Sequence, residues 1–296
     1  MIRVVKVTDG LGNQMFQYAF ARMLQLKRNE NVYLDIRFIN NEDRIARGET
    51  SRYLEENDHR SYCLEHFRIS LPVADERILT GWDYINSQNS WKKALFKLSQ
   101  YGMWIWQYRD EQKWKRSRFK ITDCLCFPVY FQGYYFDLKY YDDIKPILQK
   151  EFRLKEPMCL PRKIWRILLY EETVSIHIRR GDFTRLSQDI SRQSYYSRAI
   201  KKLNGLVKKP IFLVFSDDIE WVKENIDIDG QKIYISDMGF ADYEEFTIMK
   251  HCKHNITANS TFSYWAAYLN SNTDKIVIYP KRWEKQDIIP NGWIGI

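Results

Sequence analysis

The stretch Thr173-Val174-Ser175-Ile176-His177-Ile178-Arg179-Arg180-Gly181-Asp182 joins an apolar β-strand to a turn that carries two arginines. In an open α/β sheet, side chains that follow the carboxyl end of a strand lie where ligands bind. Adjacent residues of a strand point to opposite faces, so Arg179 and Arg180 are expected to have different roles. One guanidinium can grip a diphosphate, while the other braces the turn through a carboxylate such as Asp182. A purely structural arginine–aspartate pair is the alternative.

Alternating strand and helix patterns around this stretch predict the fold class. Beyond it we expect helices at 195–203, 219–225, 243–251 and 262–269, and strands at 211–215, 232–235, 255–257 and 275–279. This alternation is typical of a doubly wound parallel sheet. The first half also begins with strands, at 3–8 and 32–35, and then becomes irregular and rich in aromatic residues. Two prolines mark residues 151–161 as a linker, which predicts domains at 1–155 and 156–296 with a cleft between them.

A glycine turn, Asp9-Gly10-Leu11-Gly12-Asn13-Gln14, separates the first strand from a helix expected at 15–24. Strand, glycine turn and helix together aim backbone N–H groups at an anion or a sugar. The turn lacks the third glycine of the dinucleotide fingerprint, which argues against a Rossmann cofactor site. The amides of Asn13 and Gln14 can bond a hydroxyl-rich ligand. Alternatively, the glycines serve only the geometry of the turn.

Composition excludes several classes of protein. The mean hydropathy of −0.52 leaves no room for a membrane-spanning helix, and no charged-then-apolar leader precedes the first strand. Five scattered cysteines without paired spacing indicate free thiols in a reducing cytoplasm. The net charge of +8 suits acidic partners such as nucleotide phosphates, a lipid-linked diphosphate or an anionic membrane. No module typical of nucleic-acid recognition is present in the sequence.

Residues 91–116 are unusually rich in tryptophan and lysine. Such a stretch can rest on an anionic membrane as an amphipathic surface, which would place the protein at the inner face of the plasma membrane. It can also form a helix that packs its aromatic face into the protein, and we favour this second interpretation.

Several separated motifs together resemble the bacterial α1,2-fucosyltransferases. The motifs are Gly10–Ala19, the His-x-Arg-Arg-x-Asp run at 177–182, Phe215–Asp218, Cys252–Ser263 and Tyr279–Trp283. Members of that family are inverting, use GDP-L-fucose and have the GT-B fold, which consists of two Rossmann-like domains facing a cleft. The resemblance therefore implies an acceptor-side domain at 1–155 and a GDP-sugar-binding domain at 156–296.

The resemblance also implies roles for individual residues of the donor site. Arg179 is expected to contact the β-phosphate and to stabilise the charge that develops as the glycosidic bond breaks. Glu245 takes the position of the carboxylate that reads guanine, where the family usually has Asp, and Asp242 is the alternative. The remaining donor-binding candidates are His177, Arg180, Asp217, Asn259, Ser260, Thr261, Gly12 and Gln14. A structural histidine and an ordinary helix cap are the alternatives for His177 and Asp217.

The residue that deprotonates the acceptor hydroxyl group stays open at this point. Inversion favours a base opposite the leaving GDP, although an oxocarbenium-like path reduces the need for a strong one. Asp182 is one candidate, although bracing by Arg180 competes with that role. Asp9 is another, since it replaces the glycine usually found at the start of the family signature. Asn13 is expected to lie near the acceptor or the fucose.

We expect no metal cofactor. Asp227-Ile228-Asp229 has the Asp-x-Asp pattern with which a GT-A transferase holds a metal, but Gly230 follows it and the segment is predicted to be a turn. With Arg179 available to neutralise phosphate, activity should survive EDTA.

Three functional hypotheses follow. The leading one is transfer of fucose from GDP-fucose to the 2-hydroxyl of a terminal galactose on a surface glycan precursor, such as a lipid-linked oligosaccharide of O-antigen biosynthesis. The second is transfer of another GDP-6-deoxy sugar or formation of another linkage, and the third is a non-catalytic sugar-binding or nucleotide-binding protein. Acceptor specificity is expected in residues 40–135, including the aromatic loop 130–135.

Overall fold

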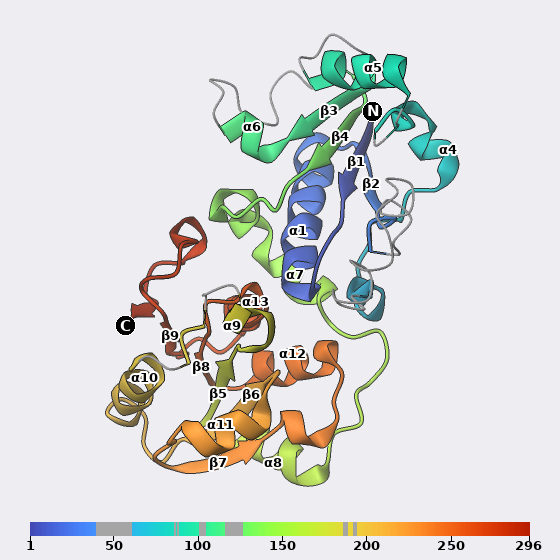
Figure 1. Cartoon of the computed structure of the whole chain (residues 1–296). Helices are drawn as coiled ribbons and strands as arrows, with labels where there is room; N and C mark the ends of the chain where they lie inside the picture. The colour runs from blue at the N-terminus through green and yellow to red at the C-terminus, as the bar shows by residue number, and fades with distance from the viewer. Residues whose placement is uncertain are drawn as a thin grey trace. The chain divides into compact units, whose positions relative to one another are not determined.

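The computed structural model describes residues 1–39, 61–85, 87, 89–100, 105–115, 127–185, 189–191 and 194–296. The chain forms two compact units (Figure 1). The first contains Met1–Glu65 and Ile69–Pro146, and the second contains His66–Arg68 and Ile147–Ile296. Each unit has its own parallel sheet, as the alternation of strands and helices predicts.

A four-stranded parallel sheet with the order β2-β1-β4-β3 forms the centre of the first unit. Its strands are β1 (Ile2–Lys6), β2 (Asn31–Asp35), β3 (Gln107–Asp110) and β4 (Val129–Gln132). Strand β2 lies on one side of β1 and β4 lies on the other, so the strand order reverses between β1 and β4. Ligands of open α/β sheets bind beyond the carboxyl ends of the strands at such a reversal.

Helices cover both faces of this sheet because neighbouring residues of a strand point to opposite sides. Helix α1 (Leu11–Arg28) packs on one face, where Phe20 lies 5.4 Å from Phe131 between ring centroids. On the other face, Val4 and Tyr130 join a buried cluster with α4 (Glu76–Leu79), α5 (Ser90–Gln100) and the segment between them. The short α6 (Glu111–Lys115) follows β3.

The second unit is built on a six-stranded sheet in which every neighbouring pair is parallel, with the order β10-β9-β8-β5-β6-β7. The strands are β5 (Thr173–Ile178), β6 (Ile211–Ser216), β7 (Gln231–Tyr234), β8 (His254–Ile256), β9 (Val277–Tyr279) and β10 (Ile294–Gly295). Here the strand order reverses between β5 and β8. The crevice beyond the ends of these two strands is therefore the expected ligand site of this unit.

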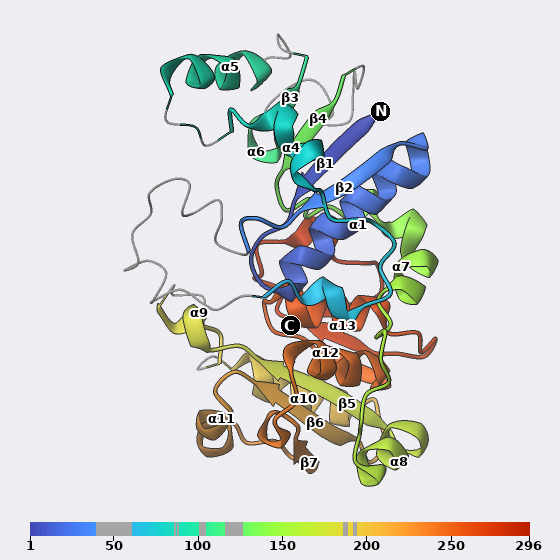
Figure 2. The ribbon, with the colours of Figure 1, turned by 90° about the vertical axis from the view of Figure 1, so that its right-hand side faces the viewer.

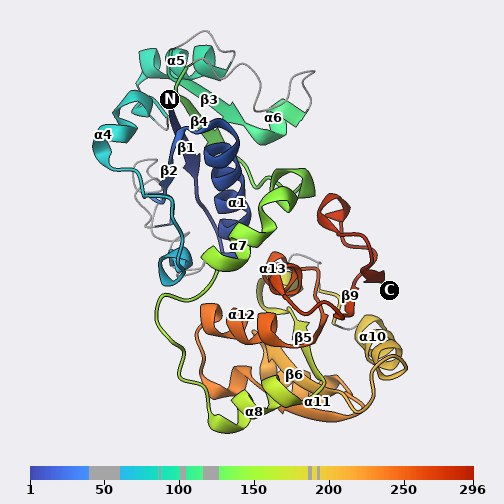
Figure 3. The same ribbon diagram turned by 180° about the vertical axis from the view of Figure 1, so that it is seen from behind.

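Six helices accompany this sheet in the described part of the chain (Figures 1 and 3). They are α8 (Arg162–Tyr170), α9 (Gly181–Arg185), α10 (Tyr195–Asn204), α11 (Ile219–Asn225), α12 (Asp242–His251) and α13 (Thr261–Leu269). Val174, Ile176 and Ile178 of β5 pack with α10 and α11 in one buried cluster. His177, which points to the opposite face, lies against Phe262 of α13. The predicted α10–α13 agree with the structure to within one residue at each end.

The boundary between the units lies earlier in the chain than the sequence predicted. The second unit begins at Ile147, within α7 (Lys145–Glu151), and not at residue 156. The physical reason is that Phe152, inside the predicted linker, is fully buried in the second unit. Its ring contacts Trp265 and Phe67, and its carbonyl accepts a hydrogen bond from the Lys250 ammonium.

The tryptophan- and lysine-rich stretch packs partly against the first unit. In α5, Leu95 and Phe96 pack against the buried cluster of the first unit, as favoured, whereas Trp91 and Leu98 are exposed. Residues 101–104 and 116 lie outside the described part of the chain. No helix within the described residues has the length and apolar content needed to cross a membrane. Cys63, Cys159 and Cys252 are free thiols, and Cys124 and Cys126 lie outside the described residues.

Candidate active site

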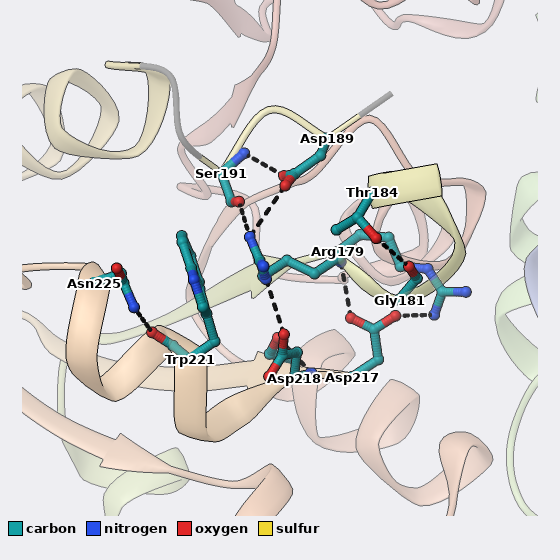
Figure 4. Close-up of polar contacts among 11 residues, drawn as sticks. Arg179, Gly181, Thr184, Asp189, Ser191, Asp217, Asp218, Trp221 and Asn225 are labelled. Atoms are coloured by element: carbon teal, nitrogen blue, oxygen red, sulfur yellow. Dashed lines mark hydrogen bonds and ion pairs between the residues drawn. The ribbon is translucent and has the colours of Figure 1, made fainter. Parts of the chain in front are cut away.

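Arg179 follows the carboxyl end of β5 and is held by the residue that follows β6. Its guanidinium forms an ion pair of 2.8 Å with Asp217, and both side chains are partly exposed. The other carboxylate oxygen of Asp217 accepts a hydrogen bond of 2.8 Å from the backbone N–H of Arg180. Asp217 therefore fixes both the turn and the direction of the Arg179 side chain (Figure 4).

Gly181 allows Asp217 to come this close. A Cβ atom at position 181 would lie 2.5 Å from the Asp217 carboxylate oxygen that pairs with Arg179. Any larger residue would push that carboxylate away, so the glycine of the motif is required for packing.

Arg180 braces the turn, which is one of the two roles predicted for it. The described partners of its guanidinium differ from Asp182, the partner that was predicted. Its buried guanidinium bonds Asp189 and Asp218, at 3.0 Å each, and the Ser191 hydroxyl at 2.8 Å. It also stacks over the Trp221 ring, 3.5 Å from the centroid. In Figure 4, Asp189 and Ser191 belong to one segment, and Asp218 and Trp221 belong to the start of α11. This enclosure corrects the expectation that Arg180 contacts the donor.

Asp218 does not cap α11, because its carboxylate bonds Arg180 and makes no capping hydrogen bond. Asp217, the predicted nucleotide ligand, instead positions Arg179. The side chain of Asp182, the predicted base or brace, lies outside what the structure describes.

His177 is a neutral, buried side chain on the face of β5 that α13 covers. Burial, together with the charge of Arg179, lowers the pKa of His177 to about 3. Among the described residues, its Nδ1 atom has no hydrogen-bond partner. A neutral imidazole adds no charge to the site and can take part only as a hydrogen-bonding group.

The turn between β8 and α13 lies beside Arg179, because β8 pairs with β5. Ser260 is the N-cap of α13 and accepts a hydrogen bond from Phe262 N–H at 3.3 Å. Thr261 begins the helix, and Asn259 before it is half-buried. The structure therefore brings Asn259, Ser260 and Thr261 to the carboxyl ends of β5 and β8, where a helix N-terminus favours an anion.

Glu245 lies at the same edge of the sheet. The Ser236 hydroxyl, which follows β7, bonds the Glu245 carboxyl and accepts a hydrogen bond of 3.0 Å from Ser216 N–H. Burial raises the pKa of Glu245 to about 7, and the nearby Asp242 and Asp217 add to the rise. Asp242 itself is exposed at the start of α12.

In the first unit, Asp9 lies where the strand order reverses between β1 and β4. It has a positive φ of 64°, a conformation that glycine adopts most readily and aspartate tolerates better than most residues. Its carboxylate accepts hydrogen bonds from the Thr8 hydroxyl at 2.9 Å and the Tyr134 hydroxyl at 2.7 Å. Tyr134 stacks on Phe136, and both rings are partly exposed.

Gln14 has a structural role in place of the predicted ligand contact. Its fully buried amide donates to the carbonyls of Asp9 and Ser61 and accepts from Cys63 N–H. Gly12 is buried in the first turn of α1, and Asn13 beside it is half-buried. Of the three residues, Asn13 is the one that is not fully buried.

Comparison with known proteins identifies the family. The model of glycosyl transferase family 11 matches residues 1–296, the whole chain. The chain belongs to glycosyl transferase family 11. The Escherichia coli O-antigen biosynthesis glycosyltransferase WbnK is 29% identical, over 98% of this chain and 99% of the relative. An α-1,2-colitosyltransferase of the same species is 26% identical, over 100% of this chain and 99% of the relative.

Solved structures with a similar fold indicate that this glycosyltransferase has the GT-B fold. The Arabidopsis thaliana FUT1 structure in complex with GDP gives a TM-score of 0.52 at 13% identity, over 95% of this chain and 71% of that chain. The fucosyltransferase NodZ from Bradyrhizobium gives a TM-score of 0.50 at 13% identity, over 90% of this chain and 92% of that chain. At such low identity the likeness concerns the fold alone.

The Asp-x-Asp segment of this family 11 glycosyltransferase is a turn, as predicted. Asp227, Ile228 and Asp229 lie between α11 and the amino end of β7, at the edge of the sheet opposite to Arg179. The Asn204 amide donates to the Asp229 carbonyl at 2.9 Å, and Gly230 has a positive φ of 133°. No group of three or more His, Cys, Asp or Glu side chains suited to a metal occurs within the described residues.

Sequence reasoning missed Asp189, Ser191, Trp221 and Ser236. Each contributes contacts from a turn or a helix outside the motif that it supports. None belongs to a local pattern in the sequence, so no signal short of the fold could have identified them. Asp218 adjoins Asp217, for which an ordinary helix cap was the alternative to a nucleotide contact, and no separate role was predicted for Asp218.

Proposed function

We propose that this glycosyltransferase transfers L-fucose from GDP-β-L-fucose to the 2-hydroxyl of a terminal galactose, with inversion, on a surface glycan precursor. The observation that carries the proposal is the placement of Arg179, fixed by Asp217, at the strand-order reversal of the second unit beside the start of α13. The names of the relatives support it, because one acts in O-antigen biosynthesis and another is an α1,2-colitosyltransferase.

In this proposal the second unit binds the donor and stabilises the leaving GDP. Cleavage of the bond to fucose leaves negative charge on the β-phosphate, and Arg179 neutralises it. The N-terminus of α13, with Thr261 and Asn259, holds the other phosphate oxygens. Because Asp217 already orients the guanidinium, little reorganisation is needed when the donor binds. This arrangement supplies the charge stabilisation without a metal ion.

Glu245 is proposed to read guanine, and this predicts a pH-dependent affinity. An ionised carboxylate accepts the guanine N1–H and N2–H groups, so the base binds the deprotonated form of Glu245 and lowers its pKa from about 7. Affinity for GDP-fucose should therefore rise as the pH rises through about 7. Below pH 7 the increase should be up to about tenfold for each pH unit. Isothermal titration between pH 5.5 and 8 measures this change; GDP-fucose is used because its diphosphate has no secondary ionisation there.

The matched variant for this prediction is Glu245→Gln. Glutamine is neutral at every pH, so the variant should bind weakly and lose the pH dependence. Asp242→Asn should keep the pH dependence and move it to slightly lower pH, because the Asp242 charge adds to the rise in the pKa of Glu245. A wild-type affinity that does not change with pH would contradict the assignment to Glu245.

The first unit is proposed to bind the acceptor where β1 and β4 end, and Asp9 is proposed to take the proton of the acceptor hydroxyl. Galactose can stack on the paired rings of Tyr134 and Phe136. Among the described residues, both hydrogen bonds that the Asp9 carboxylate receives go to one oxygen, Oδ2. The other oxygen, Oδ1, is then available to the acceptor.

Asp9→Asn is expected to lower kcat about a hundredfold, at the low end of general-base effects, because the departure of GDP leads the reaction. Asparagine tolerates the positive φ at this position, so the fold should be unchanged. GDP-fucose affinity should also be unchanged, because the donor site belongs to the second unit. Steady-state kinetics with a saturating galactoside test this, and full activity of the variant would remove Asp9 from the mechanism.

The overall proposal is tested by incubation with GDP-fucose and a panel of β-galactosides, with and without EDTA, followed by linkage analysis. We expect an α1,2-fucosylated product in both conditions. Loss of turnover in EDTA would contradict the metal-independent mechanism. A second donor, GDP-colitose, is included because the colitosyltransferase matches the whole chain. Product from that donor alone would favour transfer of another GDP-deoxy sugar.

A further inference from the structure

Helix α8 (Arg162–Tyr170) has large apolar side chains on its outer side as well as on its inner side. Ile164, Ile167 and Leu168 are buried, as expected for one face of an amphipathic helix. The opposite face carries Trp165, Leu169 and Tyr170, whose residues are 42%, 61% and 76% exposed. These are three of the twelve large hydrophobic residues that are exposed in the described part of the chain. Exposed apolar side chains that gather on one short helix indicate an interaction surface.

Three cations share this outer face with the apolar side chains. Arg162, Lys163 and Arg166 are all exposed, and no hydrogen bond or ion pair involves them among the described residues. Elsewhere in the unit, Lys223 pairs with Glu220 and Asp237, and Lys253 pairs with Glu172. The positive charge of α8 is therefore not paired with a carboxylate of the described residues.

The spacing interleaves the two kinds of side chain. One stripe of the helix contains positions 162, 165, 166 and 169, and this stripe is flanked by positions 163 and 170. An apolar and aromatic stripe bordered by cations is the pattern of helices that lie in the plane of a membrane interface. The rings and Leu169 can enter the boundary between headgroups and acyl chains, while the cations meet anionic headgroups.

We propose that the outer face of α8 docks this protein on an anionic lipid surface. A second copy of the chain is disfavoured as the occupant, because a symmetric contact would place the two sets of cations against each other. An acidic protein partner would suit the cations as well, and the test below separates it from lipid.

The position of α8 is compatible with catalysis at a membrane. The helix leads into the amino end of β5, whereas Arg179 follows the carboxyl end of the same strand (Figures 1 and 2). Six residues of strand separate the two ends by about 20 Å. The donor site would therefore stand off the lipid plane and stay open to a nucleotide sugar from solution. The docking proposal does not depend on the identity of the sugar.

The test is cosedimentation of the full chain with vesicles of phosphatidylcholine, either pure or containing phosphatidylglycerol. We expect binding to the anionic vesicles that weakens with salt and is far weaker with pure phosphatidylcholine. The triple variant Arg162→Gln, Lys163→Gln and Arg166→Gln should bind about a hundredfold more weakly. The pair Trp165→Ser and Leu169→Ser should bind about tenfold more weakly with the cations intact.

The matched control removes three exposed cations from other sites of the second unit, by Lys201→Gln, Lys202→Gln and Lys208→Gln. This control has the same net charge as the triple variant and should bind like wild type. An equal loss in the control would mean that binding follows net charge alone and would overturn the proposal. Failure of the wild-type chain to bind anionic vesicles would also overturn it, and would leave an acidic protein as the occupant to test.

Discussion

Arg179→Ala is expected to lower kcat for sugar transfer about a thousandfold while the protein remains folded. The reason is that Arg179 is the cation that the second unit places at its strand-order reversal, where the leaving diphosphate is proposed to develop charge. Its side chain is partly exposed, and an ion pair such as that with Asp217 contributes little stability at the surface, so its removal should leave the protein folded. Steady-state kinetics with GDP-fucose and thermal unfolding measure the two effects separately.

Two matched variants sharpen this result. Arg179→Lys keeps the charge but loses the planar fork, so it should recover only part of the lost activity. Arg198→Ala removes an exposed arginine of α10 and should behave like wild type. If Arg179→Ala retained wild-type kcat, both the phosphate role of Arg179 and the proposed donor site would be wrong.

The fold of the second unit could be predicted because its strands and helices carry their own local signals. Strand β5 reads as an apolar run, and the helices from α10 to α13 each show a clear beginning and end in the sequence. The domain boundary could not be predicted in the same way. Prolines at 157 and 161 suggested a linker, yet Phe152 is buried against Trp265, which lies more than a hundred residues further along the chain. Burial of that kind is a tertiary effect.

The site was predictable where one segment carries the chemistry. Arg179 was singled out from its position after a strand, and the turn at 259–261 from the resemblance to a known family. The structure places both at the carboxyl ends of neighbouring strands, because β5 pairs with β8. The partners of Arg180 were not predictable. The expected brace was Asp182, which lies in the same motif, one residue beyond Gly181. The observed partners come instead from the segment at 189–191 and from the start of α11.

Gln14 and Asp9 show the same limit in the first unit. An amide at a helix start suggested a ligand contact, but Gln14 instead ties the turn to the segment at 61–63. Asp9 was one of two candidate bases in the sequence, and only the fold shows that its carboxylate accepts a hydrogen bond from the Tyr134 hydroxyl in the loop after β4. A residue's neighbours in space decide whether a polar group is structural or available.

Arg180→Met is expected to lower the free energy of unfolding of the second unit by about 3 kcal/mol, which is more than a hundredfold in the folding equilibrium. The guanidinium is buried, and removing it leaves the carboxylates of Asp189 and Asp218 close together without a cation. It also removes the stack on Trp221. Since Asp218 is more exposed than Asp189, we place the loss at the low end of the range for buried pairs. Chemical denaturation measures it.

The design that isolates the cause adds Asp189→Asn and Asp218→Asn to Arg180→Met. If stranded carboxylates account for most of the loss, the triple variant should recover about half of it or more, because no uncompensated charge is left. If the lost stack on Trp221 dominates, the triple variant should be no more stable than Arg180→Met. In both variants GDP-fucose affinity should fall as well. Without its brace the turn can move, and the backbone N–H of residue 180 shares Asp217 with Arg179, so Arg179 would be displaced with it. Wild-type stability of Arg180→Met would contradict the bracing role and leave the order of this turn without an explanation.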